Sequence, residues 1–173
     1  MTHAILFDLD GTLVDHASAA SAALHAWSPT VGVDTDVERW IELDKWGFAR
    51  FERGETTHLG QRRDRIRAYL NRELDDATCD DIYSGYLKAY EQNWTAYPDA
   101  KGVLDRAVAT GAPVGILTNG AAPMQQDKLD RTGLGLPELV MLAASTLDSA
   151  KPRPEMYARA LTHLGATSAT IIG

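Results

Sequence analysis

Two aspartates separated by one residue, Asp8 and Asp10, directly follow the short apolar run 4–7. The run has the length and composition of a strand buried on both faces in a parallel sheet, and Gly11-Thr12 lets the chain turn away from it. Because residues i and i+2 of an extended segment share a face, both carboxylates can approach one ligand, either a hard cation or a reacting phosphate. The plainer alternative is an acidic turn that only ends the strand.

Two further polar clusters lie downstream. A Thr-Asn-Gly turn at 118–120 follows a second apolar segment, 113–118, and Lys151 precedes a later helix. Since ligands of open α/β sheets bind beyond the carboxyl ends of the strands, we expect the turn to lie beside Asp8. Either cluster alone is ambiguous, because such turns are common and most lysines are solvated. The order of the clusters along the chain is what indicates function.

Composition excludes several classes of protein. The chain has 173 residues, 45% of them apolar, and a formal charge of -7, which argues against non-specific nucleic-acid binding. A single cysteine, Cys79, allows no internal disulfide and fits a reducing compartment. The N-terminus shows no signal peptide, and no apolar stretch is long enough for a membrane span. We expect a soluble cytoplasmic protein without nucleic-acid or membrane partners, of unassigned oligomeric state.

Hydrophobic periodicity divides the chain into two parts. Between residues 16 and 97 it predicts only helices, at 17–27, 37–53, 59–74 and 78–94. After residue 98 helices and strands alternate, with helices at 99–110, 124–132 and 152–164 and strands at 113–118, 139–143 and from 170 onward. Such alternation predicts an α/β fold with a parallel sheet and right-handed crossovers, interrupted by a separate helical domain.

The series of motifs resembles the haloacid dehalogenase superfamily. The resemblance lies in Asp-x-Asp-Gly-Thr at 8–12, after the first strand, and in 117–120 and 151–155, which are similar to the superfamily's second and third motifs. The resemblance covers nearly the whole chain. It implies a Rossmann-like core domain formed by 1–15 and 98–173, with an inserted α-helical cap domain at 16–97.

The resemblance also implies a Mg²⁺-dependent phosphatase acting on a small phosphorylated metabolite. Asp8 would be the nucleophile that forms an aspartyl-phosphate, and Asp10 the acid/base for both half-reactions. Thr118, the Asn119 backbone and Lys151 would hold the phosphate oxygens. Mg²⁺ would be bound by the Asp8 carboxylate and the Asp10 carbonyl oxygen, with waters and the phosphate.

Other activities of the same fold remain open. A haloacid dehalogenase would use Asp8 to attack carbon, but halide displacement needs no proton donor, and dehalogenases of the superfamily lack an acid at the second position. A phosphomutase would keep both acids, and a catalytically silent binding module is a further alternative. Specificity would come from the cap, where Trp40, Trp46, Phe48, Arg50 and the arginines at 62–67 are candidates, although such residues usually form a helical core or a solvated face.

The superfamily's fourth motif, an acidic pair after the fourth strand, is not present. The sequence reaches that point at Ile171-Ile172-Gly173. We therefore expect the core domain to be truncated here and the gene to encode further residues, soon including an aspartate. We also expect the 173-residue form to bind Mg²⁺ poorly, since it supplies one carboxylate and one carbonyl.

Overall fold

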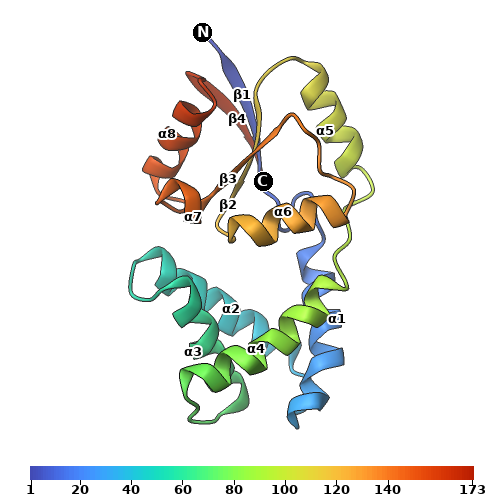
Figure 1. The fold of residues 1–173 in the computed structure, drawn as a ribbon, viewed down its shortest axis with the longest axis vertical. Helices are drawn as coiled ribbons and strands as arrows, with labels where there is room; N and C mark the ends of the chain where they lie inside the picture. Colours follow the sequence, from blue (N-terminus) through green and yellow to red (C-terminus); the bar gives the residue numbers. More distant parts are fainter. The chain divides into compact units, whose positions relative to one another are not determined.

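The computed structural model describes all residues from Met1 to Gly173. The chain divides into two compact units (Figure 1). One unit comprises residues 1–17 and 94–173 and contains the sheet; the other comprises residues 18–93 and is helical. No helix is long and apolar enough to cross a bilayer.

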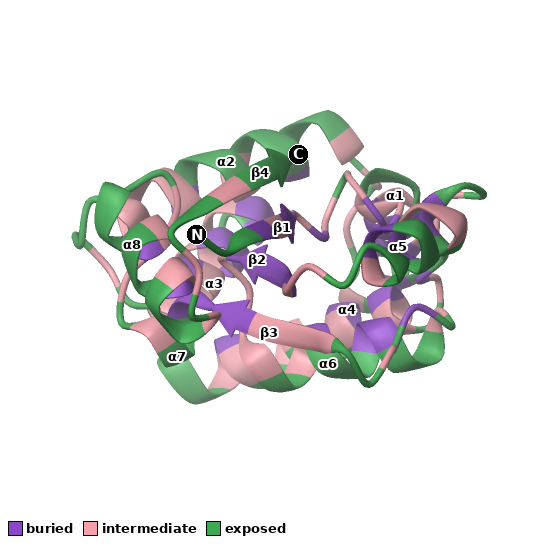
Figure 2. Ribbon diagram, turned by 90° about the horizontal axis from the view of Figure 1, so that it is seen from above, coloured by how far each residue is buried: buried purple, intermediate pink, exposed green.

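The α/β unit contains a parallel sheet of four strands in the order β3-β2-β1-β4. Its strands are β1 (His3–Phe7), β2 (Val114–Thr118), β3 (Leu139–Ala143) and β4 (Ser168–Ile172). Phe7 of β1 is in register with Ile116 of β2 and with Ile172 of β4. Every residue of β2 is buried, whereas β4 lies at an edge and is largely exposed, as Figure 2 shows. The central strands are therefore the apolar segments that the sequence predicted.

Helices cover both faces of this sheet. They are α5 (Ala100–Ala109), α6 (Ala122–Arg131), α7 (Ala144–Leu147) and α8 (Pro154–His163). Alternate strand residues point to opposite faces, so Phe7 and Ile116 pack with Leu104 of α5 and Leu129 of α6. On the other face, Leu6, Leu117 and Leu142 pack with Met156 and Ala160 of α8. Both faces of the sheet thus have an apolar core, as a parallel sheet requires.

The helical unit has an aromatic core. Its elements are α1 (His16–Trp27), which begins at the unit boundary, the 3₁₀ turn η1 (Ser28–Val31), α2 (Val37–Glu52), α3 (His58–Leu70) and α4 (Asp76–Glu91). Trp40 is buried, with ring centroids 4.5 Å from Tyr86, 5.0 Å from Tyr69 and 5.5 Å from Trp27. Rings at these spacings contribute large apolar area and favourable ring contacts, so they hold the helices together.

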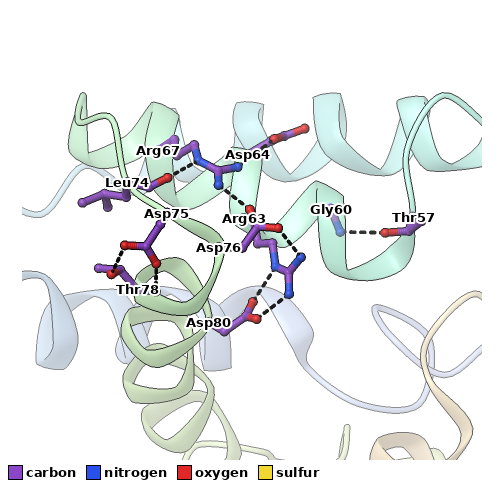
Figure 3. A network of polar contacts seen from close by, with 10 residues as sticks. All are labelled: Thr57, Gly60, Arg63, Asp64, Arg67, Leu74, Asp75, Asp76, Thr78 and Asp80. Atoms are coloured by element: carbon purple, nitrogen blue, oxygen red, sulfur yellow. Dashed lines mark hydrogen bonds and ion pairs between the residues drawn. The ribbon is translucent and has the colours of Figure 1, made fainter.

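Charged pairs join α3 to α4 at the surface of the helical unit (Figure 3). Arg63 contacts Asp76 at 2.7 Å and Asp80 at 2.5 Å, while Arg67 contacts Asp76 at 2.5 Å and donates to the Leu74 carbonyl at 2.8 Å. Pairs this exposed contribute little energy each, but the forked guanidinium contacts fix the relative position of the two helices.

The start of α4 differs from the sequence prediction, in which the helix begins at Thr78. The carboxylate of Asp75 accepts the Thr78 backbone N–H at 2.8 Å and the Thr78 hydroxyl at 2.9 Å. Asp75 therefore caps a helix that begins two residues earlier than expected, at Asp76. An aspartate is at least as good a cap as a threonine, and its hydrogen bonds hold the pKa of Asp75 below its ordinary value.

Other helix boundaries also differ from the predictions. The helix expected to extend to residue 74 ends at Leu70, because Asn71 adopts a left-handed conformation with φ 51°. The last helix begins at Pro154 and not at Pro152, since Arg153 precedes a proline and is extended. The short helix α7 was not predicted, and β4 begins two residues earlier than the expected start at residue 170.

Gly115 in β2 provides a test of this packing. A Cβ at this position would lie 2.6 Å from Leu142 Cδ1 and 3.0 Å from Leu6 Cδ2, and both leucines are fully buried. We expect Gly115→Ala to lower the free energy of unfolding by about 1–2 kcal/mol through overpacking. Gly102→Ala in α5 is the matched control, because its Cβ would meet only Arg106 Nη1, at 3.4 Å. Thermal unfolding should show a lower midpoint for the first variant only; equal midpoints would contradict this packing.

Candidate active site

The two aspartates lie at the carboxyl end of β1. The Asp8 backbone N–H donates to the Ile172 carbonyl at 2.8 Å, which continues the pairing with β4 by one residue. Gly11 then adopts φ 85°, a left-handed conformation that favours glycine, and its N–H donates to the Val14 carbonyl at 2.9 Å. The sharp turn leaves both acidic side chains at the end of the sheet.

Asp8 forms an ion pair with Lys151. Lys151 Nζ lies 2.6 Å from Asp8 Oδ1, and the two side chains are 23% and 28% exposed. The Lys151 backbone is held by Asn119, whose Oδ1 accepts the Lys151 N–H at 2.7 Å and whose Nδ2 donates to the Lys151 carbonyl at 2.9 Å. The residue after β2 therefore positions the lysine that contacts Asp8.

Asp10 has a different set of partners. Lys128 Nζ lies 2.5 Å from Asp10 Oδ1, and Gln125 Nε2 donates to Asp10 Oδ2 at 2.7 Å. Gln125 Nε2 also lies 2.7 Å from Thr118 Oγ1, which in addition accepts the Gly120 N–H at 3.0 Å. Both oxygens of the Asp10 carboxylate are thus engaged by side chains of α6.

The environment of Asp10 keeps this carboxyl ionised. Burial raises its pKa, but the charges of Lys128 and His16 and the hydrogen bonds from Lys128 and Gln125 outweigh burial, so the pKa of Asp10 lies below its ordinary value. The His16 contribution is long-range, since its Nδ1 is 4.0 Å from Asp10 Oδ1. At neutral pH the side chain is a carboxylate, able to accept a proton.

The residues selected from the sequence lie at the carboxyl ends of β1 and β2 and in the loop before α8: Asp8, Asp10, Thr118, Asn119 and Lys151. The Asn119 side chain is directed to the Lys151 backbone. Thr118 is buried, with 2% of its surface exposed.

Sequence reasoning missed Gln125 and Lys128. Both were within a predicted helix, where a lysine and a glutamine are usually solvated. Their spacing of three residues places them on one helix face, next to the apolar Leu129. A polar pair on the apolar face of an amphipathic helix was the available signal.

The cap residues suggested for specificity differ in environment. Trp40 and Arg65 are buried, and Arg65 pairs with Asp44. Trp46, by contrast, is 44% exposed, and the Arg50 guanidinium lies 4.7 Å from its ring centroid. These two residues line an open hollow of about 550 Å³ within the helical unit.

The donors available for a metal are oxygens. The Asp8 carboxylate and the Asp10 carbonyl belong to the class of ligand that Mg²⁺ prefers. No group of three or more His, Cys, Asp or Glu side chains in the chain is arranged to hold a metal. Two such oxygens do not form an all-protein cage, so a hard cation held by them would keep several waters.

Comparison with known proteins identifies the family. The model of the haloacid dehalogenase-like hydrolases matches residues 2–172, and the chain belongs to this family. It is 29% identical over 187 aligned residues to a ribulose-1,5-bisphosphate 5-phosphatase of Halopiger xanaduensis, an alignment that covers 100% of this chain and 77% of that protein. The family and its hydrolase fold are those that the sequence motifs predicted.

Solved structures share the fold. The putative HAD-hydrolase YfnB from Bacillus subtilis, described as bound to magnesium, matches with a TM-score of 0.85 at 20% identity, over 98% of this chain and 78% of that one. The L-2-haloacid dehalogenase from Xanthobacter autotrophicus matches with a TM-score of 0.69 at 25% identity, over 99% of this chain and 68% of that one. The fold of this chain is thus shared by a putative HAD-hydrolase and by a dehalogenase.

The ion pair of Asp10 with Lys128 predicts a pH-dependent stability. Because the pKa of folded Asp10 lies below its unfolded value of about 3.9, the pair contributes fully above that pH and is lost as pH falls through the folded pKa. At pH 7, we expect Asp10→Asn to lower the free energy of unfolding by about 1–3 kcal/mol, since buried Lys128 loses its carboxylate.

Calorimetric unfolding of wild type and Asp10→Asn between about pH 7 and pH 3 measures this contribution. The difference between the two should begin to shrink below about pH 4, where Asp10 of the unfolded chain becomes protonated, and should be lost as the pH falls through the lower folded pKa of Asp10. Asp105→Asn, which breaks an exposed pair with Lys101, is the control and should cost less than about 0.5 kcal/mol. A difference for Asp10→Asn that stays constant with pH would contradict the ion pair.

Proposed function

We propose that the protein is a Mg²⁺-dependent phosphatase that cleaves small phosphomonoesters through an aspartyl-phosphate. The observation that carries the proposal is the pairing of Asp8 with Lys151 at 2.6 Å, beside a second acid, Asp10, at position i+2. A lysine at the nucleophile reduces the repulsion between carboxylate and phosphate. The phosphatase named among the relatives supports the same reaction class.

The reaction has two half-reactions that use the same two acids. In the first, an Asp8 oxygen attacks phosphorus, the P–O ester bond breaks, and Asp10 gives a proton to the departing alkoxide. In the second, Asp10 takes a proton from water as the water oxygen attacks phosphorus, which frees Asp8 and releases phosphate. The ionised state of Asp10 suits the second step, and the first requires Asp10 to take up a proton beforehand.

Three groups stabilise the charge on the transferring phosphoryl group. The Thr118 hydroxyl, the Asn119 backbone N–H and the Lys151 ammonium hold its non-bridging oxygens. The hydrogen bonds between Asn119 and the Lys151 backbone keep the lysine in place before substrate binds. Such preorganisation lowers the barrier, because no reorganisation is needed during the reaction.

Mg²⁺ is the proposed cofactor. The Asp8 carboxylate and the Asp10 carbonyl oxygen are its protein ligands, and the related hydrolase described as magnesium-bound supports this choice. When bound, the ion neutralises part of the phosphate charge and orients the phosphate.

Dehalogenation is the second candidate, favoured by the likeness to the Xanthobacter dehalogenase. In that reaction Asp8 would displace halide from carbon, and no acid would be needed at position 10. Asp10 with its two partners on α6 therefore favours phosphate transfer. Assays with an aryl phosphate and with 2-chloropropionate, each in the presence of Mg²⁺, separate the two reactions.

Replacing the nucleophile tests the covalent route. We expect Asp8→Asn to abolish phosphatase turnover while leaving the thermal midpoint nearly unchanged, since the amide has the shape of the carboxylate but cannot form the aspartyl-phosphate. Asp105→Asn makes the same chemical change at an exposed position of α5 and should keep full activity. Near-wild-type turnover by Asp8→Asn would exclude Asp8 as the nucleophile.

Metal removal tests the cofactor. We expect EDTA to abolish phosphate release and excess Mg²⁺ to restore it. Ca²⁺ should restore much less, because it favours longer bonds and about 6–8 ligands, more than Mg²⁺ takes. Undiminished phosphate release in EDTA would show that the hydrolysis needs no metal.

A further inference from the structure

Two side chains of α6 converge on the proposed acid/base. Gln125 and Lys128 are each 1% exposed, so both polar side chains are almost wholly buried. They contact different oxygens of Asp10, Gln125 at 2.7 Å and Lys128 at 2.5 Å. A carboxylate held at both oxygens by buried groups has little freedom to rotate.

Because Lys128 is buried, its ammonium group is held in one position. A buried ammonium is costly unless it is paired and hydrogen-bonded, so its location is set by the Asp10 carboxylate. The ring centroid of Trp94 lies 5.2 Å from Lys128 Nζ, within the range of a cation–π contact. Charge and packing together therefore hold the ammonium against one oxygen of Asp10.

Gln125 connects Asp10 to the phosphate-binding turn. Its Nε2 donates to Asp10 Oδ2 and to Thr118 Oγ1, each at 2.7 Å. Because Thr118 Oγ1 also accepts the Gly120 N–H, both of its acceptor sites are filled and its own hydrogen must be donated elsewhere. The Thr118 hydroxyl is thereby fixed as a donor, the role that a phosphate oxygen requires.

Gly120 makes room for this arrangement. A Cβ at Gly120 would lie 2.5 Å from Gln125 Nε2 and 2.7 Å from Gln125 Cδ. The amide can therefore reach Asp10 and Thr118 only because residue 120 has no side chain. The position of the Gln125 side chain in α6 therefore depends on the glycine of the Thr-Asn-Gly turn.

We propose that Gln125 and Lys128 are positioning residues for the phosphatase reaction, which orient the Asp10 carboxylate for proton transfer. Gln125 also fixes the Thr118 hydroxyl as a phosphate donor. The inference rests on the proposed function, because it assigns these residues to the same site. It predicts that their loss impairs proton delivery to the leaving group more than it impairs substrate binding.

The test compares two substitutions to methionine with two matched controls. Gln125→Met and Lys128→Met remove the contacts to Asp10 while keeping much of the side-chain volume. Gln126→Met, one residue along the same helix, and Lys101→Met, on α5, replace exposed side chains that contact Asp130 and Asp105. Each protein is assayed with Mg²⁺ on an aryl phosphate, a good leaving group, and on an alkyl phosphate, a poor one, and its thermal midpoint is measured.

We expect both site variants to lose roughly 10–100-fold in kcat/KM on the alkyl phosphate and clearly less in kcat/KM on the aryl phosphate, because kcat/KM reports departure of the leaving group, and a good leaving group needs less help from an acid. KM for the alkyl phosphate, whose slower step is departure of the leaving group, should change less than about threefold, since substrate binding is retained. The control variants should match wild type on both substrates.

Three results would overturn the inference while leaving the phosphatase intact. They are wild-type kinetics in both site variants, equal losses on the two substrates, and losses explained entirely by a reduced folded fraction. If Lys128→Met does not fold, the kinetics of Gln125→Met decide whether the inference holds. That variant removes no charge from the interior, so the ion pair of Asp10 with Lys128 is kept. Failure of the proposed function gives a different result, in which the wild-type protein hydrolyses neither phosphate; the inference then falls with it.

Discussion

The parallel pairing of β1 with β2 and β4 is the constraint on which the site depends. Phe7 is in register with Ile116 and Ile172, so the residues that follow these strands meet at the carboxyl end of the sheet. The hydrogen bond from Asp8 N–H to the Ile172 carbonyl extends this register to the proposed nucleophile. A slip of one residue would exchange the two faces of β1 and bury the wrong side chains.

The two aspartates have different environments, and the difference matches their proposed roles. Asp8 pairs with Lys151, whose side chain is 23% exposed, whereas Asp10 pairs with Lys128, whose side chain is 1% exposed. A nucleophile needs a partner that the phosphate can also contact, as a lysine near the surface permits. An acid/base needs a fixed orientation, which a buried partner provides. Two carboxylates separated by one residue can thus serve different steps.

The sequence was informative where local pattern and tertiary structure agree. The apolar run at 113–118 predicted β2, because a strand buried on both faces must be apolar throughout. The run at 139–143 predicted β3, an edge strand whose last two residues are buried. Helix ends were less accurate, since Asp75 and Thr78 are both residue types that cap helices, and only the folded backbone shows that Asp75 is the cap of α4. The contacts of Gln125 and Lys128 could not be derived from pattern, because the distance from α6 to Asp10 is set by tertiary packing.

The most direct test of the covalent route is to trap the intermediate. Wild type and Asp10→Asn would be mixed with a phosphomonoester and Mg²⁺, quenched in acid and digested, and the peptide containing Asp8 analysed by mass spectrometry. The account predicts one added phosphoryl group on Asp8, with greater occupancy in Asp10→Asn when a good leaving group is used, because the slower step is then hydrolysis. Phosphate release by wild type with an Asp8 peptide that never carries phosphoryl in either protein would contradict it.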